Sequence, residues 1–312
     1  MHMEKLWCWI STACIIGIAF FPDSVFSQTG GDAGAFLRLG MGTRALSMGS
    51  AFTGVANDGS SIYWNPAGLG LGEHGRRFNI MSRRMPLDRD QTAISYSMGL
   101  IPGGGVGFAW IRFGVDDIDA RDLNGQPQGK ISDSENALIF SFSPKIHEKV
   151  AVGISMKILL YRLAGQSAKG FGGDIGLLVQ PVEPLTLGVM FRDIGTRISW
   201  NTSGLFPQTI QRKETFPRSF TFGAGYRLWQ QRILLSADME TAQRLGSEFR
   251  VGTEVDVAGG LHVRTGLNDG QPAFGLGFIT SIKSTQQRLH YVFLTDRIGL
   301  NETHVFEWEI GF

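Results

Sequence analysis

Polar and apolar residues alternate along the last ten residues of the chain, 303–312. The alternation predicts a strand, one face of which consists of His304, Phe306, Trp308, Ile310 and Phe312. The other face carries the two carboxylates Glu307 and Glu309. A mostly aromatic face opposite an acidic one is unusual for a sheet in water. It is typical of a strand that has lipid on one side and a polar lumen on the other.

The same period of two recurs from residue 76 onward and predicts fourteen strands. They span 76–84, 92–99, 104–113, 136–143, 150–161, 170–180, 185–193, 217–228, 232–240, 248–255, 261–268, 272–279, 287–295 and 303–312. The connections after even-numbered strands are short, whereas two of those after odd-numbered strands, 114–135 and 194–216, are long. Short turns at one end and long loops at the other are typical of outer-membrane barrels. The sequence therefore predicts an all-β fold, a fourteen-stranded antiparallel transmembrane β-barrel.

A large soluble β-sandwich is the alternative fold. It would explain the alternation, but neither the asymmetry of the connections nor the aromatic C-terminal strand. The 42 glycines favour the barrel, because glycine lets a sheet curve and leaves room in a lumen. The net charge of +1 gives no electrostatic argument for nucleic acid as a partner.

The N-terminal residues 1–27 predict a secretory signal peptide. Lys5 supplies a weak basic region, residues 6–21 are apolar, and cleavage is expected after Ser27. A retained transmembrane helix is the alternative, but the apolar run is shorter than the ~20 residues that a span needs. Both cysteines, Cys8 and Cys14, lie in this segment, so the remaining chain has no disulfide and no cysteine metal site. We expect Sec-type export to the outer membrane.

A barrel of fourteen strands encloses a lumen wider than its own side chains fill. Residues 28–75 precede the first strand and could fill it, which divides the chain into a signal peptide (1–27), a luminal segment (28–75) and a barrel (76–312). Inward positions of the strands carry charges of both signs. They include Lys157, Asp174, Arg192, Arg227, Asp238, Glu240, Glu248, Arg250, Glu254, His262, Arg264, Glu307 and Glu309. Such a lining can be an ion-paired wall, which we favour, or a selective pore.

The luminal segment contains three conspicuous motifs. The first is the run Gly-x-Arg-Ala-Leu-x-Met-Gly-x-Ala at 42–51, the second is the pair Asn57-Asp58, and the third is Tyr-Trp-Asn-Pro-Ala-Gly-Leu at 63–69. This segment resembles the start of the PorV/PorQ family of bacterial outer-membrane proteins, which are relatives of the FadL-type transporters of long-chain fatty acids and hydrocarbons. The specific match covers about forty residues, and over the rest the resemblance is architectural.

The resemblance implies a FadL-like barrel with the N-terminal segment, or hatch, tucked into the lumen. The motif residues that it singles out are Arg44, Asp58, Tyr63, Trp64, Asn65, Pro66 and Gly68. An Asn-Pro pair favours a turn, and Tyr and Trp have polar tips that need partners when they are buried. These residues could also do no more than brace the lumen. The C-terminal strand resembles the assembly signal of outer-membrane barrels, carried by Phe306, Trp308, Ile310 and Phe312.

The sequence offers no catalytic constellation, and we expect neither enzymatic activity nor a cofactor. The histidines after residue 27 are scattered, without metal-ligand spacing. No serine lies in a nucleophile elbow. The glycine-rich run 103–107 lacks the lysine and the helix of a phosphate-binding loop, and predicts a turn.

The connection 194–216 is a candidate site for a partner or ligand. Its apolar residues Trp200, Leu205, Phe206 and Phe216 are unusual for a loop that only faces solvent. They could fold over the mouth of the barrel or contact a hydrophobic ligand or partner.

Two functions remain open. The PorV/PorQ resemblance implies an accessory component of type IX protein secretion, whose partners would be translocon subunits and secreted proteins with C-terminal sorting domains. The alternative is a FadL-like channel for uptake of hydrophobic small molecules, for which we expect a continuous apolar pocket in the lumen. A lumen crossed throughout by ion pairs would count against the channel. In either case the barrel would contact outer-membrane lipid.

Overall fold

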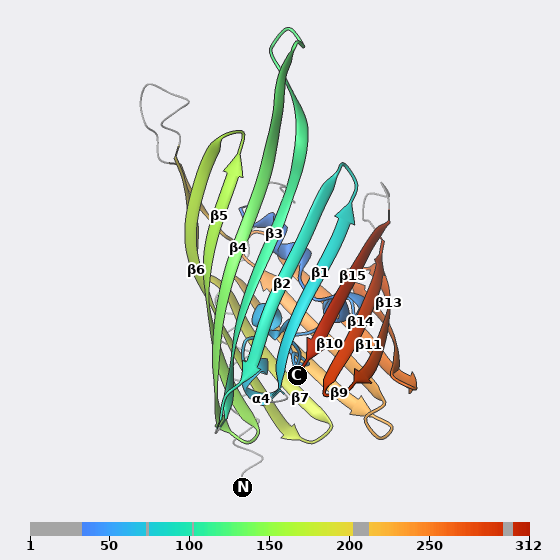
Figure 1. The fold of residues 1–312 in the computed structure, drawn as a ribbon. Helices are drawn as coiled ribbons and strands as arrows, with labels where there is room; N and C mark the ends of the chain where they lie inside the picture. The colour runs from blue at the N-terminus through green and yellow to red at the C-terminus, as the bar shows by residue number, and fades with distance from the viewer. Residues whose placement is uncertain (1–32, 73–74, 102, 202–211, 296–301) are drawn as a thin grey trace.

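The computed structural model describes residues 33–72, 75–101, 103–201, 212–295 and 302–312 as a closed antiparallel barrel (Figure 1). Fourteen strands form the wall, each paired with its neighbours, and the barrel closes where β1 pairs with β15. This confirms the predicted fold class. The proposed signal peptide, 1–27, lies outside the described residues. No helix among the described residues is long and apolar enough to cross a membrane.

The wall strands differ in length. Their bounds are β1 (Arg76–Met85), β2 (Arg89–Gly99), β3 (Gly104–Arg121), β4 (Pro127–His147), β5 (Val150–Leu163), β6 (Gln166–Val182), β7 (Leu185–Asn201), β9 (Ser219–Leu228), β10 (Ile233–Ala242), β11 (Gly246–Ala258), β12 (Leu261–Asn268), β13 (Gln271–Ile282), β14 (Thr285–Leu294) and β15 (Thr303–Gly311). A fifteenth strand, β8 (Arg212–Thr215), pairs with residues 197–200 of β7, beyond the part of β7 that pairs with β9.

We call the end of the barrel that holds Phe312 the base and the opposite end the rim. The prediction of a long loop at 114–135 was wrong, because β3 and β4 continue to pair as far as Arg121 and Pro127. This hairpin rises above the neighbouring strands in Figure 1. Part of 194–216 is also strand, since β7 extends to Asn201 and β8 follows at 212–215.

The two faces of the wall differ as the alternation predicts. On β15, Phe306 and Trp308 point outward and are 60% and 44% exposed, whereas Glu307 and Glu309 point inward and are buried. Ile80 of β1 lies opposite Trp308 on the outer face, and Met81 lies opposite Glu307 on the inner face. The outer face is apolar where lipid would cover it, and the inner face is polar or small.

The N-terminal segment lies inside the barrel, where it is visible as the blue helices of Figure 1. Residues 33–72, which we call the plug, form four short helices: η1 (Ala35–Leu39), α2 (Thr43–Ser47), α3 (Ser61–Trp64) and α4 (Gly68–Leu71). Their apolar side chains, together with inward residues of the wall, form the main hydrophobic core. Phe52 and Ile62 are fully buried in it. The core of this protein is therefore the lumen itself.

Candidate functional site

Glycines on both sides of the contact bring the plug directly onto the wall. Gly49 adopts a φ of 62°, and a Cβ added to it would lie 2.6 Å from the backbone nitrogen of Leu267 on β12. On the wall, a Cβ at Gly252 would lie 2.3 Å from the carbonyl oxygen of Met48. Contacts that short exclude any side chain. Part of the high glycine content thus serves to seat the plug.

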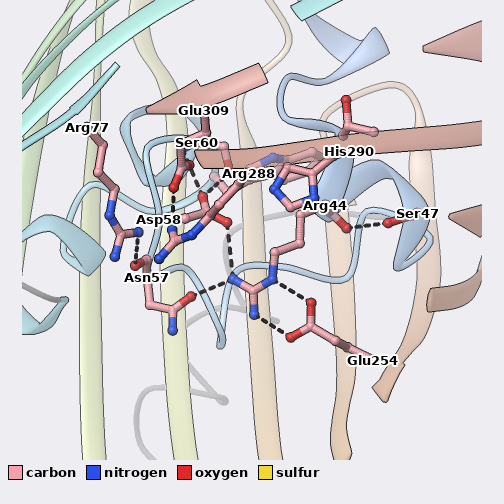
Figure 2. Close-up of polar contacts among 12 residues, drawn as sticks. Arg44, Ser47, Asn57, Asp58, Ser60, Arg77, Glu254, Arg288, His290 and Glu309 are labelled. Carbon is pink, nitrogen blue, oxygen red and sulfur yellow. Dashed lines mark hydrogen bonds and ion pairs between the residues drawn. The ribbon is translucent and has the colours of Figure 1, made fainter. Parts of the chain in front are cut away.

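Arg44 of α2 is the centre of the polar contacts in Figure 2. Its Nε and Nη2 donate to the two carboxylate oxygens of Glu254 on β11, at 2.7 and 2.8 Å. Its Nη1 donates to Asn57 Oδ1 at 2.7 Å and to Asp58 Oδ2 at 3.1 Å. A bidentate guanidinium–carboxylate pair has a fixed geometry and is among the stronger polar contacts. Arg44 therefore joins the plug to the wall and to its own later residues.

Asp58 is held within the plug by several donors. Besides Arg44, it accepts hydrogen bonds from the Ser60 backbone amide at 2.9 Å and the Ser60 hydroxyl at 2.6 Å. Burial by itself raises the pKa of the Asp58 carboxyl, but the charge of Arg44, the Ser60 hydrogen bonds and the charge of Arg77 outweigh it. The pKa of Asp58 is therefore below its ordinary value, and the group is ionised at neutral pH.

Carboxylates on the wall also accept hydrogen bonds from the plug backbone. Asp238 of β10 accepts from the amides of Phe52 and Thr53, at 3.0 and 2.8 Å. Glu307 of β15 accepts from the amide of Thr43 at 2.5 Å. Thr43 begins helix α2, where the amide has no intrahelical partner, and Phe52 and Thr53 lie between α2 and α3. Inward carboxylates of the wall therefore satisfy plug amides that no helix pairs.

The two aromatic residues of the third motif are buried with their polar tips satisfied. The Tyr63 hydroxyl donates to the carbonyl oxygen of Leu37, and Trp64 Nε1 donates to the carbonyl oxygen of Met41 at 2.6 Å. The Arg192 guanidinium of β7 lies 4.6 Å from the centre of the Tyr63 ring. That distance is within cation–π range. Tyr63 and Trp64 thus hold the first plug helices against the third.

The Asn-Pro-Ala-Gly part of the motif makes the turn between α3 and α4. Asn65 is extended before Pro66, as the residue before a proline prefers. Its side-chain amide donates to the carbonyl oxygens of Thr53 at 3.0 Å and Leu177 on β6 at 3.1 Å. A Cβ at Gly68 would lie 2.1 Å from the carbonyl oxygen of Ala56. All seven motif residues named from the sequence lie in the plug, and Arg44, Tyr63 and Asn65 contact the wall directly.

Two cavities lie on either side of the plug, and no residue lines both. The rim cavity has a volume of about 350 Å³. It is lined by Ala35, Arg38, Leu39, Ser50, Tyr63, Trp64, Arg192, Glu240, Ala242, Leu245, Gly246, Glu248, Arg250, Asn268 and Gln271. The base cavity, of about 340 Å³, is more polar. The lumen thus has no continuous apolar pocket within the described residues.

Ion pairs cross the inner wall between neighbouring strands. Lys157 of β5 is 2.7 Å from Asp174 of β6 and also contacts Asp193 of β7. Arg250 of β11 is 2.6 Å from Glu240 of β10. Most inward charges that the alternation predicted are in such pairs, which agrees with an ion-paired wall. No group of three or more potential metal ligands occurs among the described residues.

Sequence reasoning missed several inward polar residues of β1, although the same alternation contains them. Arg77 donates to the Asn57 carbonyl oxygen at 3.1 Å, and Asn79 donates to Glu309 at 2.7 Å. Arg83, which is 3% exposed, donates to the carbonyl oxygen of Leu39 at 3.0 Å. Each of them contacts the plug or the seam between β1 and β15.

The candidate loop at 194–216 is only partly described. Leu205 and Phe206 lie outside the described residues. Trp200 lies on the extension of β7, where its ring packs edge-on against Tyr161 at 6.3 Å. Phe216 is buried, and a Cβ at Gly34 would lie 2.1 Å from its ring. Phe216 therefore packs on the beginning of the plug rather than facing solvent.

The fold is similar to those of several solved transporters. The Pseudomonas putida toluene transporter TodX matches with a TM-score of 0.60 and 14% identity, over 87% of this chain and 97% of that chain. The Ralstonia pickettii toluene transporter TbuX matches with a TM-score of 0.58 and 14% identity, over 87% of this chain and 97% of that chain. A Pseudomonas aeruginosa FadL homologue matches with a TM-score of 0.58 and 10% identity, over 86% and 97%. No protein-family model matches the chain, and no curated protein does.

Two of these neighbours are toluene transporters and the third is a FadL homologue, so the fold is of the FadL type. None of them is a PorV or PorQ protein, so the comparisons support the FadL half of the resemblance stated above and give no support to the other half. At identities of 10–15% the likeness establishes the fold. What the barrel carries has to be argued from its own residues.

Proposed function

We propose that this chain is an outer-membrane channel of the FadL type that takes up small hydrophobic molecules. The observation that carries the proposal is the match of 87% of this chain to 97% of a toluene transporter's chain. The apolar outer face supports this location, and the signal peptide predicted for residues 1–27 is what an exported outer-membrane protein would carry. The FadL-like channel, which the sequence offered as the alternative function, is therefore the principal hypothesis.

The rim cavity is the proposed first binding site. Its floor is formed by Tyr63 and Trp64, and Ala242 and Leu245 lie on its wall. Aromatic and aliphatic groups here stand beside five charged ones, and a small ligand could lie on the apolar groups while the polar ones fix its orientation. Its volume of about 350 Å³ is within the usual range for a small-molecule pocket.

Passage beyond the rim cavity requires the plug to shift. The plug fills the lumen between the two cavities, and the Arg44–Glu254 pair ties it to the wall. A continuous apolar pocket, which we expected for a channel, is absent from the described residues. The structure is therefore proposed to be a closed state in which a ligand reaches the rim cavity but goes no further.

Uptake of labelled toluene by cells that produce the protein tests the proposal. Ala242→Trp would fill part of the rim cavity, whereas Gln243→Trp, in the exposed turn beside it, would not. We expect the wild type and Gln243→Trp to raise uptake above that of cells without the protein, and Ala242→Trp to lose most of the increase. Equal uptake with and without the protein, for toluene and for a long-chain fatty acid, would contradict the proposal.

The motifs at 42–69 are the one observation that favours a second candidate, an accessory role in type IX secretion. The comparisons add nothing in its support. Its test is purification of the tagged barrel from native outer membranes, followed by mass spectrometry. Recovery of translocon subunits, or of secreted proteins with C-terminal sorting domains, would favour this role over uptake.

A further inference from the structure

The base cavity has more positive than negative groups around it. Its charged lining consists of Arg44, Arg77, Arg227, Arg264, Arg288, Asp58, Glu254 and Glu309. Five guanidinium groups against three carboxylates leave an excess of two positive charges. His262 and His290 also line the cavity. The rim cavity, with three arginines and two glutamates, has an excess of only one.

The carboxylates of the base cavity are already shared. Glu254 accepts from Arg44 at 2.7 Å and from Arg264 at 2.6 Å, so one negative charge serves two guanidinium groups. Arg264 also contacts the His290 ring at 3.1 Å rather than a second carboxylate. Glu309 is bound by Arg288. The existing ion pairs therefore leave part of the positive charge uncompensated.

Arg227 is the clearest sign of a missing anion. It lies at the base end of β9 and is partly buried, and its side chain makes no hydrogen bond or ion pair with any other residue in the described part of the chain. A guanidinium carries five N–H donors, and its partner is commonly a carboxylate or phosphate when it leaves bulk water. Arg227 meets neither.

Charged residues just outside the cavity carry both signs. Glu307 of β15 lies opposite His290 in the sheet, but it does not line the cavity, and its carboxylate accepts hydrogen bonds from the Thr43 amide and Asn79. Asp256 of β11 pairs across the sheet with His262, but it is exposed and does not line the cavity. Arg232, in the turn after β9, is exposed as well and contributes the opposite charge. The cavity thus keeps its positive excess from the residues that line it.

We propose that the base cavity binds a phosphate group through Arg227 and Arg264, with Arg44 of the plug beside them. A phosphate carries about two negative charges near neutral pH, which matches the excess, and its oxygens suit guanidinium forks. The cavity, of about 340 Å³, has room for this ion together with water. Because Arg44 belongs to the plug and Arg227 to the wall, a bound phosphate would also fasten the closed plug.

Isothermal titration of the full barrel in detergent with inorganic phosphate, in a phosphate-free buffer, tests this proposal. We expect saturable binding that weakens as salt is added. Arg227→Ala should lower the affinity at least about tenfold, since one charge-assisted partner is lost. Arg227→Lys should lower it less. The matched control Arg232→Ala, which removes an exposed arginine from the neighbouring turn, should bind as the wild type does.

Thermal unfolding of the same variants separates loss of a site from loss of fold. Phosphate should raise the unfolding temperature of the wild type and of Arg232→Ala, but not that of Arg227→Ala, because a ligand stabilises only the state that it binds. Absence of saturable binding to the wild type, or wild-type affinity in Arg227→Ala, would overturn the proposal.

Two further probes identify the source of the phosphate group. Phosphoethanolamine represents a lipid headgroup, and acetate represents a carboxylate. Binding of inorganic phosphate alone would assign the site to free phosphate, and binding of phosphoethanolamine as well would admit headgroups. Binding of acetate as tightly as phosphate would contradict a site for a dianion. The assay is independent of toluene uptake, so each proposal can fail without the other.

Discussion

The two halves of the plug are attached to the barrel in different ways. The first half, residues 42–58, is tied by charged side chains: Arg44 binds Glu254, and backbone amides of this half bind Glu307 and Asp238. The second half, residues 60–72, is packed. Ile62 is fully buried, and helix α4 lies against β3, β4 and β5.

This difference indicates which part of the plug can move. Polar attachments can be exchanged for water or for another ion at a modest net cost. Both halves also pack closely on wall glycines, the first at Gly252 and the second at Gly153. Residues 60–72, however, contain no charged side chain and so have no ion pair to exchange. We therefore expect the first half to move when a ligand passes, and the second half to stay as part of the wall.

Removal of the shared carboxylate should have the largest effect. Glu254→Gln leaves Arg44 and Arg264 without their anionic partner, and breaking a buried pair of this kind costs about 3 kcal/mol. Unfolding in urea, in phosphate-free buffer, measures the loss. The control Glu248→Gln removes a more exposed carboxylate that pairs with Arg250, and should cost about 1 kcal/mol or less. An equal loss of unfolding free energy in the two variants would show that Glu254 contributes no more to stability than Glu248 does.

A packing change in the second half should cost somewhat less. An added methyl at Gly68 would meet the Ala56 carbonyl oxygen at 2.1 Å, so we expect Gly68→Ala to lower the free energy of unfolding by about 2 kcal/mol. Gly75→Ala is the control, because nothing lies within 4 Å of a Cβ there. The cost of Gly68→Ala should not change with salt, whereas that of Glu254→Gln should. If the stability cost of both substitutions changed with salt, the two halves would not differ in how they are attached.

Acid should loosen the first half, with the smallest of the three effects. The folded pKa of Asp58 is lowered, so its contribution is complete above the unfolded pKa of about 3.9 and is lost as the pH falls through the folded value. Urea unfolding followed from pH 6 to pH 2 should show a shallower acid loss in Asp58→Asn than in the wild type. If the free energy of unfolding fell equally with acid in Asp58→Asn and in the wild type, Asp58 would not contribute to the acid dependence of stability.

Sequence reasoning reached the barrel because alternation is a local property. Glu307, Asp238 and Glu254 could each be placed on the inner face from their neighbours alone. Sequence reasoning missed the extension of β3 because that part of the hairpin is exposed on both faces. Around Asp116 and Asp117 neither face of the strand is apolar, so the alternation is absent. The same lack of contrast conceals strand wherever a hairpin leaves the membrane.

The partners of the plug could not be predicted in the same way. Arg44 and Glu254 are separated by 210 positions in the chain. Their meeting depends on strand register, on the depth of the plug and on glycines such as Gly252 and Gly266 that admit it. The resemblance of the N-terminal motifs pointed to the right segment. Only the assembled lumen shows which residues attach it to the wall, and that the Arg227 side chain has no hydrogen-bond or ion-pair partner among the residues that the structure describes.

The most direct test is to follow the two halves of the plug separately during ligand binding. The chain has no cysteine after residue 27, so pairs of spin labels can be placed at will. One pair, at Asn57→Cys and Ser167→Cys, reports the first half from a half-buried position outside the rim cavity, and another, at Leu71→Cys and Ser281→Cys, reports the second. On addition of toluene we expect a second distance population in the first pair and none in the second. Unchanged distances in both pairs, in a barrel shown to take up toluene, would contradict the account.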